Sequence, residues 1–165
     1  MGTADTDYTL VLDFDDNKHA IVIKKSSETI EGQTITSYKQ DGAYSCTLRL
    51  YDQSGKEVKD FTSDRNVIWS LYSGTLGSSS DLEFITGSLN NNQWVAKNKM
   101  EIQLGPKALI SNPTSIIVIQ ASVNWGDRTL IAYLPVPLTN NANFNHIKGP
   151  TWITYLSDGS ISFDN

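Results

Sequence analysis

The 165-residue sequence contains a single cysteine, Cys46, so no disulfide can form within one chain. No apolar run approaches the roughly 18 residues of a membrane-spanning helix. The first residues also lack the basic stretch followed by an apolar stretch that marks a secretory signal. Lysine and arginine number 13 against 18 acidic residues, which gives a formal charge of −5. This balance argues against a protein that binds the backbone of nucleic acids.

Residues with catalytic or metal-binding chemistry are also scarce. The two histidines, His19 and His146, lie far apart in the sequence and have no neighbouring ligands that would suggest zinc. No nucleophile elbow, phosphate loop or dinucleotide fingerprint is present. The acidic segment 13–17 begins like a calcium loop, but lysines stand at 18 and 24, where a glycine and a carboxylate are required. We therefore expect no enzymatic activity, no cofactor and no metal.

The residues that are abundant favour strands. Isoleucine and threonine each number 15, and serine, threonine and asparagine together make 46 of the 165 residues. No stretch shows the 3.6-residue period of a helix over three turns, whereas short alternating segments recur between turn-forming residues. This pattern predicts an all-β protein, a sandwich or a barrel.

The alternation defines the expected strands and core. We predict a first hairpin over 8–24, a polar loop over 26–33, and a second hairpin in which 57–61 pairs back on 44–51. A short strand over 34–38 should turn Ile35 inward. The remaining expected strands are 66–72, 81–86, 99–104, 116–123, 129–134, 152–156 and 161–163. Cys46 should be buried, and the core should contain Leu48, Leu50, Val67, Trp69, Leu71, Ile102, Ile117, Ile119 and Ala121.

Several of these strands match a known pattern. The segment Ser45–Leu50 (SCTLRL) precedes a glycine turn, and Val67–Ser70 (VIWS) follows it. Later, Ile117–Val123 (IVIQASV), a tight turn and Thr129–Tyr133 (TLIAY) follow in that order. Together they resemble the immunoglobulin-like sandwich modules of bacterial and phage proteins. The resemblance implies an antiparallel sandwich in which Trp69, on the third strand, fills the space between the sheets. No second cysteine faces Cys46, so the disulfide of antibody domains is absent.

The resemblance also suggests how the chain is divided. It covers residues 44–140, which we expect to form the immunoglobulin-like sandwich. Residues 1–43 should form an extra N-terminal hairpin and loop packed on it. Residues 141–165 should form a linker and a C-terminal hairpin, or the start of a following module. The segment Gly149–Tyr155 (GPTWITY) resembles the stretches that follow such modules in phage structural and tail-fibre proteins.

Three tryptophans outside the expected core are candidate surface contacts: Trp94, Trp125 and Trp152. Trp94 follows three asparagines, Trp125 lies in a hairpin turn, and Trp152 lies near the chain end. Exposed tryptophans often mark a binding surface. The alternative is that these rings fold back over the open ends of the sandwich.

The resemblance implies a non-enzymatic structural or adhesion module of a phage virion or another surface assembly. Such a module would contact other subunits or modules of its assembly, or a receptor. The alternative function is a carbohydrate-binding module that presents Trp94 and Trp125 to a surface glycan. It would hold the two rings coplanar, with Asp, Asn or Arg side chains close by.

Overall fold

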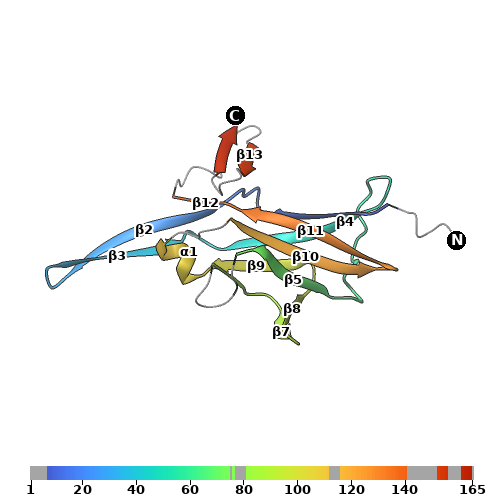
Figure 1. Ribbon diagram of the computed structural model, residues 1–165, viewed down its shortest axis with the longest axis horizontal. Coiled ribbons are helices and arrows are strands. Elements are labelled where there is room, and N and C mark those ends of the chain that lie inside the picture. Colours follow the sequence, from blue (N-terminus) through green and yellow to red (C-terminus); the bar gives the residue numbers. More distant parts are fainter. Residues whose placement is uncertain are drawn as a thin grey trace.

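Figure 1 shows the computed structural model, which describes residues 7–74, 76, 81–111, 116–140, 152–155 and 161–164. Within these residues nearly all of the regular secondary structure is β-strand. The elements are β1 (Thr9–Phe14), β2 (Ile21–Ile30), β3 (Gln33–Gln40), β4 (Tyr44–Tyr51), β5 (Val67–Ser73), β6 (Leu82–Phe84), β7 (Ser88–Asn90), β8 (Gln93–Ala96), β9 (Lys99–Leu104), α1 (Pro106–Ser111), β10 (Ile117–Trp125), β11 (Arg128–Val136), β12 (Leu138–Thr139), β13 (Trp152–Tyr155) and β14 (Ile161–Asp164).

Two antiparallel sheets enclose one hydrophobic core, as expected for a β-sandwich. The first sheet has the order β1-β4-β9-β6 and the second the order β11-β10-β5-β8-β7. Burial alternates along their strands, most regularly in β9 and β10, so every second side chain faces the core. Eight of the nine predicted core residues are buried, with Trp69 only 1% exposed. The ninth, Leu71, is partly buried and packs against the edge of the core.

The predicted N-terminal hairpin is wrong in its pairing. β1 pairs with β4 over its whole length, from Thr9 opposite Tyr51 to Phe14 opposite Cys46. The turn that follows contains two residues with positive φ, Asp16 at 60° and Asn17 at 56°. It leads the chain away from β1, and β2 then pairs with β3 and β12. The apolar face of β1 thus joins the core beside β4.

Three other local predictions are wrong in whole or in part. The segment 57–61 pairs back on β4 only at its start, through the Tyr51–Glu57 bridge and the hydrogen bond from the Val58 N–H to the Leu50 carbonyl, whereas β9 pairs with the other end of β4. The expected polar loop 26–33 is instead the end of a two-stranded ribbon, and Ile35 is 50% exposed rather than turned inward. Helix α1 was not expected; it begins at Pro106, where a fixed φ suits a first helical turn.

The predicted C-terminal hairpin is confirmed. β13 and β14 pair antiparallel, with Trp152 opposite Asp164 and Tyr155 opposite Ile161. They form a two-stranded sheet of their own.

Candidate functional site

The most prominent surface feature is a β-ribbon that extends beyond the sandwich (Figure 1). It consists of the outer parts of β2 and β3, and every residue from 24 to 39 is exposed. We call residues 24–39 the arm. A two-residue turn closes its tip, with Glu31 at a φ of 51° and Gly32 at 81°. Two consecutive positive φ values give the type of turn whose twist matches that of a β-hairpin.

Side chains on the arm are arranged by its register. Glu28 lies opposite Ile35, and Ile30 lies opposite Gln33, so the two isoleucines are diagonal neighbours on one face near the tip. Ile30 is 46% exposed and Ile35 is 50% exposed. Tyr38 lies on the other face, opposite Lys25, and is also exposed. The arm therefore presents apolar side chains to its surroundings without a core of its own.

The root of the arm, by contrast, is firmly attached to the sandwich. The Gln40 side chain accepts a hydrogen bond from the Leu104 N–H at 2.9 Å and donates to the Ile102 carbonyl at 3.4 Å. On the other strand, the Val22 N–H donates to the Tyr44 hydroxyl at 3.0 Å. β12 runs beside this end of β2, pairing with Ile21 and Val22. The arm thus projects from a fixed base.

Trp94 lies in β8 rather than on a loop, and it is half-buried. Its indole N–H donates to the Thr86 carbonyl at 2.6 Å, and its ring lies 6.2 Å from that of Phe84, which is buried. One part of the ring therefore closes the edge of the core. The rest lines a groove.

The groove has a volume of about 600 Å³ and lies beside the β7–β8 hairpin. Its floor includes Ser70, Gln120 and Ser122 from the outward-facing positions of β5 and β10, and Asn92 and Gln93 line it from the hairpin. Amide and hydroxyl groups beside an aromatic ring can bind a polar ring-shaped ligand such as a sugar. This is the arrangement closest to the predicted carbohydrate site.

Trp125 occupies a different environment at the end of β10. Its ring makes edge contacts with Tyr8 at 5.5 Å and Phe61 at 6.4 Å, and the Arg65 guanidinium lies 4.2 Å from its centroid. Trp125 thus folds back and closes one end of the sandwich. Trp94 and Trp125 pack against separate neighbours instead of each other. Trp152 lies in β13, and its side chain is outside the described residues.

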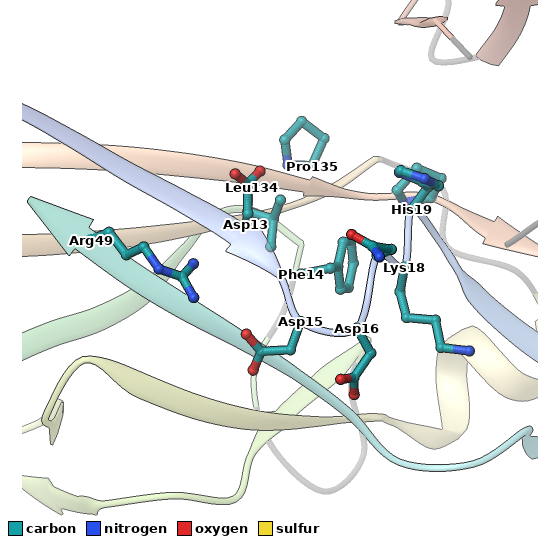
Figure 2. A pocket seen from close by; sticks show the side chains of 11 residues that line it. Asp13, Phe14, Asp15, Asp16, Lys18, His19, Arg49, Leu134 and Pro135 are labelled. Atoms are coloured by element: carbon teal, nitrogen blue, oxygen red, sulfur yellow. The ribbon is translucent and has the colours of Figure 1, made fainter. Parts of the chain in front are cut away.

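A second groove, of about 580 Å³, lies between the β1–β2 turn and the end of β11. Figure 2 shows the carboxylates of Asp13 and Asp15 pointing away from one another. Asp15 accepts hydrogen bonds from the hydroxyls of Ser45 and Thr47, both at 2.6 Å, and its carboxylate lies 3.7 Å from the Lys99 ammonium. This carboxylate ties the turn to β4. No group of three or more His, Cys, Asp or Glu residues suited to a metal occurs in the part of the chain that the structure describes.

The pKa of Asp15 reflects these contacts. Burial alone would raise the pKa of this carboxyl. The hydrogen bonds from Ser45 and Thr47, together with the positive charges of Lys99 and Arg49, outweigh burial and lower the pKa below its usual 3.8. Asp15 therefore stays ionised as a structural group and is unsuited to act as a proton donor near neutral pH.

Cys46 is fully buried in β4, as predicted. Burial, and secondarily the negative charge of Asp15, raises the pKa of its thiol to about 12. The thiol donates a weak hydrogen bond to the Met100 carbonyl at 3.7 Å. A thiol in this environment does not act as a nucleophile.

No family model, curated protein or solved structure matches the chain.

Sequence reasoning predicted only one strand of the arm, at 34–38, although the sequence holds a signal for the hairpin. Thr29-Ile30 and Thr34-Ile35-Thr36 lie on the two sides of Glu31-Gly32, and a glycine between two strand-forming segments indicates a turn. The polar character of the segment suggested a loop instead. Among the described residues, no helix is long and apolar enough to cross a membrane.

Proposed function

We propose that this protein is a non-enzymatic structural module of a larger assembly, a phage virion or another surface structure, and that the arm contacts the neighbouring subunits. The observation that carries the proposal is the arm itself. An isolated two-stranded hairpin is at best marginally stable in water and needs further strands or a packing surface. The arm has 16 consecutive exposed residues, including Ile30, Ile35 and Tyr38. A neighbouring protein would supply the missing surface.

The strand order supports the more specific proposal of an immunoglobulin-like sandwich. In such domains one sheet has the order A-B-E-D, and the other contains the order G-F-C. The sheet β1-β4-β9-β6 and the run β11-β10-β5 fit these orders when β5, which carries Trp69, is taken as strand C. The departure is that β6 precedes β7 and β8 in the chain, whereas extra strands beside C normally precede D. The assignment to a virion rests on the sequence resemblance alone.

The test is a variant with a shortened arm. Replacing residues 27–36 by Asn-Gly would close Ser26 directly onto Ser37 through a favourable two-residue turn, because this cross-strand pair is in phase with Ile30–Gln33, the pair that closes the native turn. We expect the full chain to form larger species in light scattering as its concentration rises. The shortened variant should remain monomeric and keep its melting temperature, because the removed residues are outside the core. Equal association of both proteins, or a full chain that remains monomeric throughout, would contradict the proposal.

The second candidate function, carbohydrate binding, is favoured by the groove beside Trp94. Gln120 is the better probe than Trp94, because the tryptophan also closes the core edge through its bond to Thr86. If a glycan array gives a hit, Gln120→Ala should weaken binding about tenfold or more. The control is Ile131→Ala on the neighbouring strand β11, which is exposed and is not part of the groove. Equal loss in both variants, or no glycan bound at all, would remove this candidate.

A further inference from the structure

The two long edges of the arm differ in how well they are protected against pairing. β12 covers β2 only at Ile21 and Val22, and α1 contacts β3. No strand among the described residues pairs with the outer part of either edge. The β2 edge carries Lys24, Lys25 and Glu28, the kind of charges with which proteins protect an edge strand.

The β3 edge has no such protection along its outer part. From Gln33 to Tyr38 its sequence is QTITSY, six residues without a charge or a proline. Segments of this kind, rich in β-branched residues, pair readily with another strand. An open, uncharged strand edge is therefore the part of the arm best suited to take up a partner.

From this asymmetry we infer that the partner is a second copy of this chain, whose β3 lies antiparallel beside β3 and completes a four-stranded ribbon, β2-β3-β3-β2. This inference rests on the proposed function and specifies its contact. In a symmetric pair, the backbone groups along the open β3 edge of each copy form hydrogen bonds with those of the other. The resulting four strands give the stability that two strands lack.

The charges along the arm favour the antiparallel direction. Lys24, Lys25 and Lys39 lie at the base, whereas Glu28 and Glu31 lie towards the tip. Antiparallel arms place the acidic tip of one copy beside the basic base of the other, whereas parallel arms would place like charges together.

One register of the two β3 strands brings opposite charges and apolar side chains together. With Ile35 opposite Ile35 of the second copy, Lys39 lies towards the tip of that copy, where the turn carries Glu31. The isoleucine, half exposed in one chain, then gains an apolar cross-strand partner. Thr34 and Thr36 lie opposite one another in the same arrangement.

Disulfide capture tests this register in the full chain. In Ile35→Cys, two facing thiols would be within the Cα separation that a disulfide needs, and oxidised glutathione would accept the two electrons as the bond forms. The native Cys46 is buried and does not compete. The matched control is Glu28→Cys, on the same face and at the same distance from the tip but on the β2 edge.

We expect most Ile35→Cys chains to become covalent dimers on a non-reducing gel and Glu28→Cys chains to remain single.

A second pair of variants tests the same edge without introducing a cysteine. Thr36→Lys should weaken dimerisation at least tenfold in sedimentation, whereas Ser27→Lys, at the paired position on β2, should leave it unchanged.

Three other outcomes would overturn the inference. Capture through Glu28→Cys instead would place the contact on the wrong edge. Equal effects of the two lysine variants would show that neither edge is preferred. If the full chain associates through its arm but Ile35→Cys gives no dimer, this pairing is wrong while the proposed function stands. Association that persists with the shortened arm would instead contradict the proposed function itself.

Discussion

Trp69 lies at the centre of the sandwich. It is 1% exposed, its ring lies 6.2 Å from that of Phe84 on the opposite sheet, and its indole N–H donates to the Lys97 carbonyl at 3.1 Å. Trp69→Ala should therefore lower the free energy of unfolding by roughly 3–5 kcal/mol. Denaturant titration measures this loss. Tyr72→Ala in the same strand is the control, because Tyr72 is 69% exposed and its removal should cost far less. Similar losses in the two variants would show that Trp69 is not a core residue.

Asp15 should make stability depend on pH. Its folded pKa lies below the usual value, so its contribution is present above about pH 4 and is lost as the pH falls through the folded pKa. Asp15→Asn should therefore lower stability at pH 6 and reduce the decline between about pH 5 and 2. Urea unfolding across this range measures both effects. Asp16→Asn, at an exposed neighbouring position, is the matched control. An unaltered profile in Asp15→Asn would contradict the prediction.

At the scale of elements, the β7–β8 hairpin depends on a close approach at Gly87. Its φ is 92°, and an added Cβ would lie 2.2 Å from the Val95 carbonyl oxygen and 2.7 Å from the Ala96 Cβ. Gly87→Ala should therefore displace the hairpin and open the groove beside Trp94.

Gly55→Ala is the control for backbone strain. Gly55 has a similar φ of 87° but open space around it, so an added Cβ there would not clash. Both variants lose the conformational freedom of glycine. Gly87→Ala should cost about 1–3 kcal/mol more than Gly55→Ala in thermal or urea unfolding. Equal costs would mean that β7 and β8 are not packed this closely.

For the strands, the sequence predicted which side chains face the core better than it predicted which strands pair with each other. Alternation identified the inward positions of β4, β5, β9 and β10, because a half-buried strand has a period of two whatever its neighbour is. It did not identify β9 as the neighbour of β4, since that pairing joins residues more than 50 positions apart. The arm was predicted only in its strand 34–38, for a different reason: residues 24–39 bury nothing within the chain, so they lack the apolar alternation that reveals a strand.

The candidate site was likewise predicted only in part. The sequence indicated Trp94 and Trp125 as unusual, and both proved to be half-buried at the margins of the core. It could not predict the polar residues that complete the groove beside Trp94. Ser70, Gln120 and Ser122 come from two strands whose adjacency depends on long-range pairing.

For the molecule as a whole, Cys46 offers a measure of global unfolding. Its side chain is fully buried in β4, between β1 and β9, and its raised pKa disfavours the reactive thiolate. A thiol reagent should label no cysteine in the native protein and one per chain in denaturant. The melting temperature should be the same with and without reductant. Rapid labelling under native conditions would show that β4 opens locally.

The root of the arm determines how the protein would bear tension. β2 runs parallel to β12, so a pull along the arm loads the pairs Ile21–Leu138 and Val22–Thr139 in shear, and both must break together. On the other strand the same pull is resisted by the Gln40 side chain, which is anchored on β9. The load therefore reaches the sandwich at Ile21, a fully buried residue. A neighbouring subunit that binds the arm would therefore transmit force directly to the core of the sandwich, without first unfolding the edge of the sheet.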